Sequence, residues 1–584
     1  MKAKPGKKRQ AAPAPRPSPP RRDWRPYLAA GAALLAALWA YSPALHGPFV
    51  FDDTALPFTL TSASAPLLAW IRGVRPVLMA SYWVNTALSG EDTFSYHVLN
   101  LVIHLIASGL VFLIVRRLLG WSQAPDARRT LVAGFAAGVF LLHPIQTEAV
   151  AYVAGRSESL SVTLLLAAYA VFLYRRRAAI AWGIVLLVLL LYGLAVLSKE
   201  HTVVLLALLL LTDFWWNPGF SLRGIFRNWR LYAPLALGAG FALAFFWKTI
   251  RNSPSAGFSL RDVTWYQYLF TEWRALLVYP AEFVLPARLT ADWDFPFSRG
   301  VFDRGAIFGL IVLVAIAIAA WHYRRRFPLA CFGYFVYLVL MSPTSSILPI
   351  ADPLAERRLY LGMLGLLLIV VDFVGRVRVD SKKLAAALVA VLLAAAVLTH
   401  ARAAVWADPV ALWEDTAAKA PHKRRVLFQL ATTYAAAGRC QDAVEEYQKM
   451  AEQFPPDYEV LLDWGLAYDC LNQPELALQK LRQAANLEPT GHVYSQIGMV
   501  YAKRGRWAEA LDALDLAERI DPGEATTYMY MGDIHLSLNH AAEAVADYRK
   551  ALALLSRPRP LIALQPYLEV VRQKLADAQA RAAH

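Results

Sequence analysis

Two adjacent carboxylates, Asp52 and Asp53, follow the first apolar segment of the chain, in the sequence Phe-Val-Phe-Asp-Asp-Thr. A charged side chain is costly at the edge of a lipid bilayer, so a carboxylate pair at that height indicates a functional site. The simpler interpretation is an Asp-rich turn, or a cap at the end of a membrane helix. The pair alone excludes neither interpretation, and the polar residues that follow must decide between them.

Further polar clusters recur at the ends of apolar segments, on what we expect to be the same side of a membrane. Their basic members are Arg75, Lys199, Arg357 and Arg358, and the others are His143, Glu148, Arg156, Glu158 and Glu200. Lys and Arg at this height can hold a phosphate whose hydrocarbon tail lies in the membrane, while a carboxylate acts as base on an incoming hydroxyl or holds a metal. Each cluster alone also fits an ion pair, a helix end or a side chain that reaches the lipid headgroups. If a divalent metal takes part, Asp52 and Asp53 are its expected ligands.

The composition is that of a membrane protein. The 584 residues are 57% hydrophobic, with a mean hydropathy of +0.37, which is unusual for a soluble enzyme. Much of the formal charge of +15 falls in residues 1–26, which we expect to form a disordered cytoplasmic arm with affinity for anionic lipid. This distribution argues against nucleic-acid binding. The three cysteines lack zinc-ligand spacing, which excludes a zinc site or a disulfide framework.

Eleven apolar runs of membrane-spanning length predict a polytopic helical bundle over residues 27–400. They fall near residues 27–45, 98–115, 131–150, 158–174, 179–197, 202–216, 231–249, 305–322, 328–343, 359–375 and 384–400. The Arg and Lys clusters between the runs collect on one side, which the positive-inside rule assigns to the cytoplasm. We therefore expect an inner (plasma) membrane protein with a cytoplasmic N-terminus, and the odd number of passes places the C-terminal part outside, in the periplasm or its equivalent.

Residues 265–283 form another apolar stretch, interrupted by Glu272 and Arg274. Counting it as a twelfth pass would move the cluster Arg324–Arg326 to the outer side, against the charge rule. We therefore predict an interfacial or re-entrant helix there. The first apolar run is expected to be an uncleaved signal anchor.

A repeat of roughly 34 residues occupies 424–556, after a predicted linker at 401–423 and before a predicted capping helix at 557–584. Small residues recur at Ala443, Ala477, Ala510 and Ala544, with spacings of 34, 33 and 34 residues. A second set, Ala431, Gly465, Gly498 and Gly532, marks the close-packing point of a first helix. This pattern predicts four tetratricopeptide repeats, an α-solenoid that binds protein or peptide. The whole chain is therefore expected to be all-α.

In this register, Cys440 begins the second helix of repeat one and Cys470 ends the first helix of repeat two. Stacked repeats bring these two ends to the same edge, so a disulfide can form in an oxidising compartment. The alternative, which we favour from the sequence, is two small buried residues that pack without a bond.

The order of the membrane-edge motifs resembles a known family. The motifs that carry this resemblance are, in order, FDD after the first span, Arg75-Pro76, the Asn100/His104 helix, HPIQTEAVAYVAGRSE, SKEH, and LAERRLYL before a late span. In these motifs the chain resembles the transmembrane-and-TPR-containing (TMTC) protein O-mannosyltransferases and their bacterial relatives, which are GT-C glycosyltransferases. The likeness covers residues 27–400 and continues into the repeats. The repeats are fewer than the eukaryotic members of that family carry.

The resemblance implies an inverting transfer of a sugar, mannose in the family, from a polyprenyl-phosphate carrier to a Ser/Thr hydroxyl of an exported protein. It places the acidic motif on Asp52 and Asp53, either of which would act as the base. The donor phosphate would meet the four basic residues Arg75, Lys199, Arg357 and Arg358. No organic cofactor is implied; the lipid-linked sugar is the donor substrate, and the repeats would bind the acceptor.

Two functions of other classes remain open. A non-enzymatic scaffold, in which a polytopic anchor presents the repeats to partner proteins, requires nothing of Asp52 or Asp53. A flippase or transporter is a weaker alternative, because it needs ionisable residues in the middle of spans, whereas here they gather at the outer ends.

Overall fold

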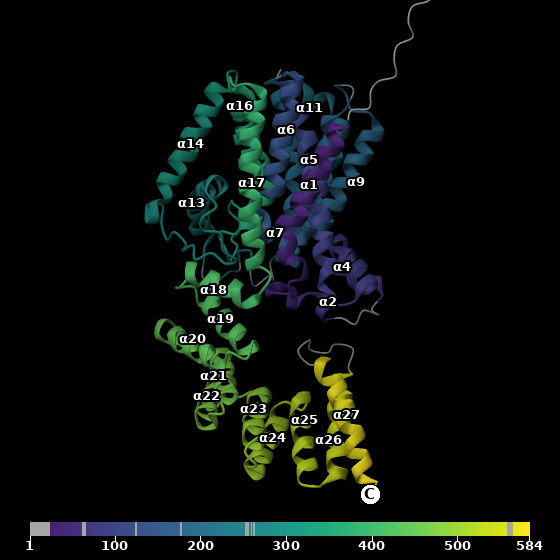
Figure 1. Cartoon of the computed structure of the whole chain (residues 1–584), viewed down its shortest axis with the longest axis vertical. Helices are drawn as coiled ribbons and strands as arrows, with labels where there is room; N and C mark the ends of the chain where they lie inside the picture. Colours follow the sequence, from purple (N-terminus) through teal and green to yellow (C-terminus); the bar gives the residue numbers. More distant parts are fainter. Residues whose placement is uncertain are drawn as a thin grey trace, which may run out of the picture.

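The predicted all-α fold is confirmed (Figure 1). The computed structural model describes residues 24–60, 66–122, 125–175, 178–250, 256–258, 260, 263–556 and 565–583. Within these ranges the regular elements are helices, and one isolated bridge joins Ala256 to Ile350. Residues 1–23 of the predicted basic arm lie outside the described residues.

Each of the eleven predicted apolar segments contains a helix. These helices are α1 (Arg25–Tyr41), α5 (Thr93–Trp121), α6 (Asp126–Leu142), α8 (Arg156–Leu173), α9 (Trp182–Ser198), α10 (Leu205–Trp216), α12 (Trp229–Ile250), α14 (Ala306–Tyr323), α15 (Pro328–Met341), α16 (Leu359–Arg376) and α17 (Ser381–Val405). By length and composition, seven helices in the described residues can cross a membrane, or eight if α6 and the helical segment after its 50° bend count as one span. The helices α9 and α15 are apolar but shorter.

The polar motifs explain where two of these helices end. Helix α9 stops because Lys199 is extended (φ −160°, ψ 131°). Helix α6 stops at His143, also extended, because the residue before a proline is disfavoured in helical conformation. The chain then continues through short helical turns, η3 (Pro144–Gln146) and α7 (Thr147–Ala151). The segments that carry the candidate site residues are therefore breaks between apolar helices.

A helix forms at 265–283 as predicted: α13 spans Trp265–Val284 and is not among the candidate membrane spans. Its Glu272 is fully buried. Its position at a membrane interface stays a prediction.

Small residues set the closest approach in the bundle. A Cβ on Gly365 of α16 would lie 2.4 Å from the backbone nitrogen of Tyr337 in α15. A Cβ on Gly333 of α15 would lie 2.6 Å from the carbonyl oxygen of Gly365. Glycines at such crossings let two backbones touch, which is a main source of helix association in membranes.

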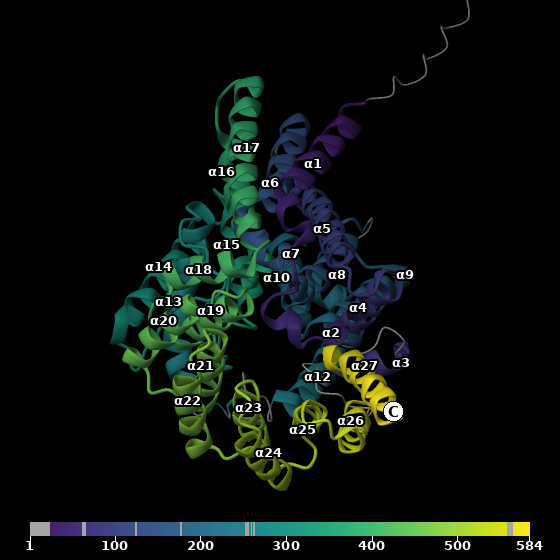
Figure 2. The same ribbon diagram turned by 60° about the horizontal axis from the view of Figure 1, so that its bottom comes forward.

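Short elements cover the end of the bundle to which the repeats attach (Figures 1 and 2). They are η2 (Phe51–Ala55), α2 (Pro57–Leu60), α3 (Leu67–Ile71) and α4 (Pro76–Ser89). The acidic motif lies in η2, so this end of the molecule carries both the acidic motif and the repeats.

The C-terminal part consists of four helix pairs and a last helix, which confirms the tetratricopeptide pattern. The pairs are α19 (Arg424–Ala436) with α20 (Cys440–Gln453), α21 (Tyr458–Cys470) with α22 (Pro474–Leu487), α23 (Gly491–Ala502) with α24 (Trp507–Ile520), and α25 (Ala525–Ser537) with α26 (Ala541–Leu555); α27 (Gln565–Ala582) follows. The glycines at the predicted close-packing point have no room for a side chain: a Cβ on Gly498 would lie 2.7 Å from Leu514.

The segment 401–423, predicted as a linker, is largely helical. Helix α17 continues to Val405, and α18 spans Pro409–Lys419. The Asp408 side chain accepts a hydrogen bond from the Val410 N–H at 3.0 Å, which caps α18. Because Leu412 and Trp413 are buried, α18 packs against its neighbours rather than forming a free connection.

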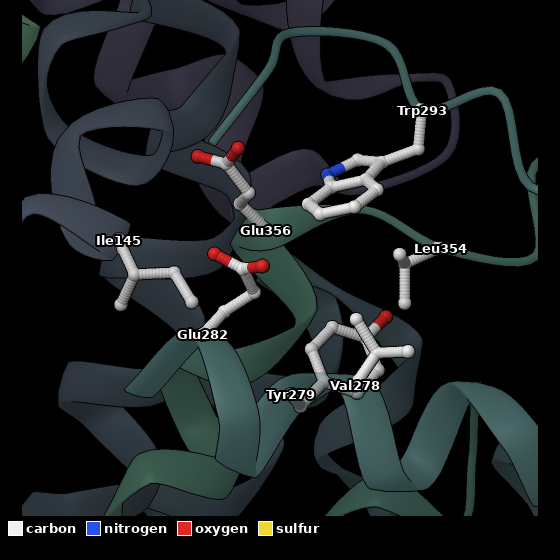
Figure 3. Close-up of a pocket in the computed structure, with 7 residues that line it drawn as sticks. All are labelled: Ile145, Val278, Tyr279, Glu282, Trp293, Leu354 and Glu356. Carbon is white, nitrogen blue, oxygen red and sulfur yellow. The ribbon is translucent and has the colours of Figure 1, made fainter. Parts of the chain in front are cut away.

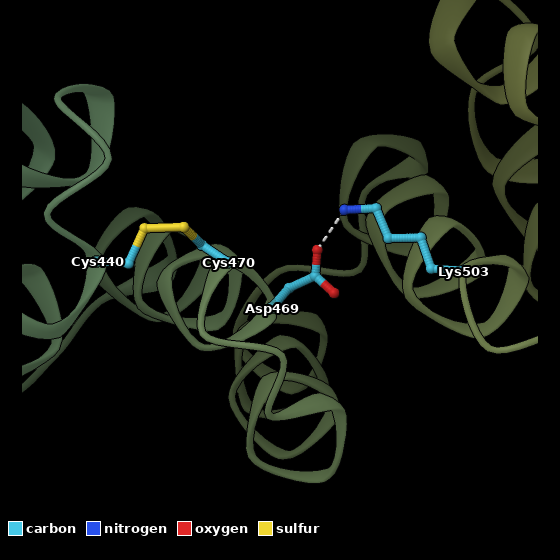
Figure 4. Close-up of a disulfide and its surroundings, with 4 residues drawn as sticks. All are labelled: Cys440, Asp469, Cys470 and Lys503. Atoms are coloured by element: carbon cyan, nitrogen blue, oxygen red, sulfur yellow. Dashed lines mark hydrogen bonds and ion pairs between the residues drawn. A yellow bond between two sulfur atoms is a disulfide. The ribbon is translucent and has the colours of Figure 1, made fainter.

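The structure joins Cys440 and Cys470 by a disulfide, with 6.1 Å between their Cα atoms (Figure 4). The predicted positions at the start of α20 and the end of α21 are confirmed, and the favoured interpretation of two unbonded buried residues is wrong. The bond forms because the edges of the first and second repeats meet at these two cysteines. Beside the bond, Lys503 pairs with Asp469 at 2.5 Å and links the second repeat to the third. Cys331 is a free buried cysteine.

We expect the denatured protein to expose one thiol without reductant and three after reduction, counted with a thiol reagent. The bond closes a loop of 30 residues, so the paired change Cys440→Ser and Cys470→Ser should destabilise the repeats by about 3 kcal/mol in the chain-entropy description. Cys331→Ser is the control, because it removes the free thiol and leaves the bond. Three thiols in the unreduced protein would contradict the disulfide.

Candidate active site

The two carboxylates of the acidic motif lie in different environments. The Asp53 side chain is fully buried; its Oδ1 accepts the N–H of Ala154 at 2.7 Å and its Oδ2 accepts the N–H of Val50 at 3.2 Å. The Asp52 side chain is exposed, and its backbone N–H donates to the hydroxyl of Tyr152 at 2.8 Å. Asp53 therefore fastens η2 to the segment after α7, whereas Asp52 can meet a substrate.

Burial raises the pKa of Asp53 to about 8, while the backbone N–H groups of Val50 and Ala154 oppose the rise. Its two oxygens are already occupied as acceptors. The pair therefore does not offer two free carboxylates to a divalent metal. In the part of the chain that the structure describes, no three His, Cys, Asp or Glu side chains form a metal-ligating group.

The residue before the acidic pair has an unusual backbone. Phe51 adopts the left-handed conformation (φ 53°), which costs an ordinary L-residue on the order of 1 kcal/mol and persists only when its surroundings enforce it. Its ring packs against the rings of Tyr152 and Trp413, with centroids 6.2 and 5.4 Å away.

Three of the predicted phosphate-binding cations are held in ion pairs. Arg75 binds Glu200 through Nε at 3.0 Å and through its terminal nitrogen at 2.6 Å. Lys199 binds Glu158, and Arg357 binds Glu148, which also accepts the backbone N–H of Arg357 at 2.7 Å.

These cations act on one another. Burial lowers the pKa of Lys199, Glu158 opposes this, and Arg75 and Arg357 lower it further. The side chains of Arg75, Lys199 and Arg357 remain 33, 14 and 26% exposed. The structure thus brings together three of the four predicted cations, each accessible enough to contact a ligand.

Tyr152 connects this group to the acidic loop. Burial raises its pKa, Asp53 and Asp52 raise it further, and Arg357 lowers it. One phenol therefore lies within electrostatic reach of both the exposed carboxylate and a candidate phosphate-binding arginine. Transfer from a phosphate ester to a hydroxyl requires a base and a cation close to the reacting atoms.

Arg358 differs from its neighbour Arg357. Its side chain is 7% exposed and lies 3.9 Å from Glu272 of α13, and it donates to the carbonyl oxygens of Pro353, at 2.8 Å, and Asp352. Burial raises the pKa of Glu272 to about 7, and Arg358 opposes this rise. Arg358 is thus occupied within the protein, so its predicted contact with the donor is not favoured. In the sequence, Glu272 is only an interruption of an apolar stretch.

Arg156 is completely buried and uses its guanidinium inside the bundle. It donates to the side-chain oxygens of Asn100 and Asn85, both at 2.7 Å, and to the Tyr96 carbonyl at 3.0 Å. Its guanidinium carbon also lies 4.6 Å from the ring centroid of Tyr82. Arg156 therefore joins α4, α5 and α8 and does not line the outer surface as grouped in the sequence analysis.

His143 also has an internal role. Its Nδ1 accepts the N–H of Ile145 at 3.2 Å, so Nε2 carries the proton that it donates to the Phe283 carbonyl at 2.9 Å. The ring stacks on Phe283, with centroids 5.3 Å apart. The helix-end interpretation of this histidine is the one that its contacts favour.

A small pocket, with room for about one water molecule, lies between α13 and the segments that carry Ile145 and Glu356 (Figure 3). Two carboxylates line it, Glu282 of α13 and Glu356, next to Arg357. Glu356 accepts the Thr290 N–H through Oε1, and its buried Oε2 has no partner in the described structure. Sequence reasoning did not single out Glu282, since an isolated glutamate near a helix end carries no distinctive spacing.

We expect Asp53→Asn to destabilise the protein by about 1–3 kcal/mol, because an amide cannot accept both backbone hydrogen bonds. The matched control Asp52→Asn should change stability by less than about 0.5 kcal/mol. Thermal unfolding in detergent measures both.

Because the folded protein keeps the Asp53 proton up to about pH 8, far above the ordinary pKa of 3.8, the stability that this group contributes at low pH is lost as the pH rises. The loss of stability caused by Asp53→Asn, relative to the wild-type protein, should therefore be larger at pH 5 than at pH 8. The same difference in unfolding temperature between the two proteins at both pH values would contradict the burial of this carboxyl group.

Known proteins resemble this chain both in its repeats and in its apolar helical part. Residues 425–456 and 525–554 each match the family model described as Tetratricopeptide repeat. The chain is also similar to a thermophilic TPR protein of Thermus thermophilus, at 23% identity over 33% of this chain and 96% of that chain, with a TM-score of 0.26.

The chain is also similar to protein O-mannosyl-transferases. One from Caenorhabditis elegans is 25% identical over 450 residues, covering 72% of this chain and 61% of the relative. Tmtc1 of Drosophila melanogaster is 36% identical over 140 residues, covering 24% of this chain and 15% of the relative. The chain thus spans less than two thirds of the length of these relatives. It is similar to the TMTC protein O-mannosyl-transferases and carries tetratricopeptide repeats after its apolar helices.

Proposed function

We propose that the protein is an inverting membrane glycosyltransferase of the GT-C type. It transfers a sugar, mannose by homology, from a polyprenyl-phosphate carrier to a Ser or Thr hydroxyl of an exported protein. The observation that carries the proposal is that the Tyr152 hydroxyl accepts the backbone N–H of exposed Asp52 and that Tyr152 lies within electrostatic reach of Arg357. The apolar helices around the site suit a donor whose tail lies in a membrane.

In this mechanism Asp52 removes the proton of the acceptor hydroxyl as that oxygen attacks the anomeric carbon. The bond from that carbon to the phosphate oxygen breaks, and the charge that develops on the phosphate is stabilised by Arg75, Lys199 and Arg357. Their carboxylate partners hold these cations in place before the donor arrives. A phosphate that binds them shares or replaces those partners, so no cation has to be ordered during the reaction.

Asp53 has a positioning role in this proposal, because its oxygens accept backbone N–H groups. No step is assigned to a metal. The acceptor protein is bound by the tetratricopeptide repeats, whose stacked helices form an extended surface for peptides.

Eleven membrane passes then consist of the seven long helices, the bent pair of α6 with the segment after it as an eighth, and α9, α15 and the short helix α10 as three further spans. The basic clusters between the helices favour a cytoplasmic N-terminus. The acidic motif and the repeats, which lie at the same end of the bundle (Figure 1), are then on the outer side of the membrane.

A reporter fused after residue 420 should be active outside the cytoplasm, and one inserted between Arg324 and Arg326 should be active inside, because eleven passes separate the two termini. Paired reporters of opposite compartment preference measure this in whole cells. A fusion after residue 420 that is active only in the cytoplasm would contradict the odd number of passes.

Transfer of radiolabelled sugar from a polyprenyl-phosphate donor to a Ser/Thr acceptor peptide tests the function in membranes. Asp52→Asn should reduce the rate by about 10²–10³-fold, the typical loss for one transition-state partner. Arg357→Ala should raise the apparent donor KM or lower kcat, and Arg357→Lys should not restore it fully, since a lysine lacks the planar fork that binds a phosphate through two hydrogen bonds.

Arg376→Ala is the matched control. This arginine pairs with Asp372 at 2.7 Å at the other end of α16, so its loss should leave transfer unchanged. Full activity of Asp52→Asn would contradict the proposed base and favour the membrane-anchored scaffold, which depends on the repeats alone.

A further inference from the structure

Helix α18, which leads into the repeats, and the first repeat helix, α19, contact the acidic loop directly. Phe51 packs at the border of two hydrophobic clusters. One cluster belongs to the outer end of the bundle and contains Tyr152 and Trp406. The other belongs to α18 and α19 and contains Trp413, Ala420, Val426 and Leu430. The ring of Trp413 meets the Phe51 ring edge to face, with centroids 5.4 Å apart and an angle of 82°.

The guanidinium of Arg425, in α19, also faces Phe51, with 5.7 Å between its carbon and the ring centroid. The same arginine binds both oxygens of buried Asp292, at 2.7 Å each, and Oδ1 of Asp352 at 2.8 Å. Lys423 reaches the same two carboxylates, at 2.5 and 3.1 Å. One basic corner of the first repeat therefore contacts the acidic loop and two outer loops at once.

One of those loops leads to the cation cluster. Asp352 lies a few residues before Arg357 in the chain, and Glu356 lies 3.9 Å from Arg402 of α17. Arg402 in turn binds Asp415 of α18 at 2.6 Å, and Asp415 binds Lys419 at 2.6 Å. Both sides of the candidate site, the base and the phosphate-binding arginine, are thus linked to α18 and α19.

We propose that α18 and α19 are positioning elements of the active site, and that Trp413 and Arg425 hold Phe51 in its left-handed conformation and so aim the Asp52 carboxylate. The inference rests on the proposed function, in which Asp52 is the base. It goes beyond that function because it gives the repeat domain a role in the chemical step besides acceptor binding.

The physical reason is that Phe51 has a side chain in a backbone region that favours glycine (φ 53°). Such a conformation is kept by its packing, and here part of that packing comes from another domain. Without the Trp413 ring, η2 can relax toward an ordinary backbone geometry. Asp52 is held through its backbone N–H, which donates to Tyr152, so its carboxylate follows any movement of the η2 backbone.

The position of the loop can be tested without any assay of activity. A nitroxide is attached to Asp52→Cys; Cys331 is buried and the other two cysteines are bonded, so the label goes to one thiol. Trp413→Ala should increase the mobility of the nitroxide in the paramagnetic resonance spectrum, and Trp413→Phe should keep the wild-type spectrum because it keeps an aromatic ring. Arg425→Gln is a second variant, in which Lys423 still holds the outer loops. It should give an intermediate increase in nitroxide mobility, and it keeps the test available where Trp413→Ala does not fold.

Arg506→Ala is the matched control, since Arg506 forms an exposed pair with Glu509 in the third repeat. It should not change the spectrum. Identical spectra for Trp413→Ala, Arg425→Gln and the control would overturn the inference, whatever the protein's activity proves to be.

The second measurement uses the transfer assay with a short hydroxyl acceptor. Trp413→Ala should lower kcat by about 10²-fold, the scale of a misplaced catalytic group, with an unchanged donor KM; Trp413→Phe should restore it. A changed donor KM at constant kcat would overturn the positioning role. If the wild-type protein transfers no sugar, the proposed function fails while the spectra still decide whether the repeats hold the loop.

Discussion

A charge inside an apolar bundle needs a partner, and the rest of this structure depends on that constraint. Removing an ion from water costs several kcal/mol even after the protein relaxes, so each buried charge fixes the elements that satisfy it. Arg156 meets the requirement with two asparagine side chains and a carbonyl. The buried carboxyl of Asp53, which keeps its proton up to about pH 8, is a polar group under the same constraint, and two backbone N–H groups satisfy its oxygens. Together they lock the acidic loop and the segment after α7 to helices α4, α5 and α8.

The same constraint separates charges that the protein encloses from charges that stay partly exposed. Arg358 is enclosed and satisfied by carbonyl oxygens and Glu272. Arg75 and Arg357 are paired yet partly exposed. A cation that is already held by a carboxylate, and that still faces outward, is ready to accept a phosphate with little ordering cost. The breaks between apolar helices, at His143 and Lys199, provide the places where such residues can stand at the end of the bundle.

A solenoid is stabilised mainly by contacts between neighbouring repeats, so its orientation depends on how its first unit is attached. Here the attachment is a buried aromatic contact and a group of ion pairs in which Lys423 and Arg425 share Asp292 and Asp352. The attachment also reaches Phe51. The surface that would select an acceptor and the loop that would activate it are therefore parts of one assembly.

The sequence by itself determined the features that depend on near neighbours in the chain. Apolar runs gave the helices of the bundle, and the spacing of Ala443, Ala477, Ala510 and Ala544 gave the repeat register, because helix periodicity and repeat packing are read over a few turns. The order of the motifs indicated the likeness to a family, and the alternation of apolar and polar segments predicted that the polar clusters lie at one end of the helical bundle. Tertiary structure decided which of two adjacent carboxylates is buried, which of two adjacent arginines is enclosed, and that Cys440 bonds to Cys470. Those outcomes depend on partners such as Glu200 for Arg75 and Glu148 for Arg357, which lie 125 and 209 residues away, and no local pattern specifies a neighbour at that distance.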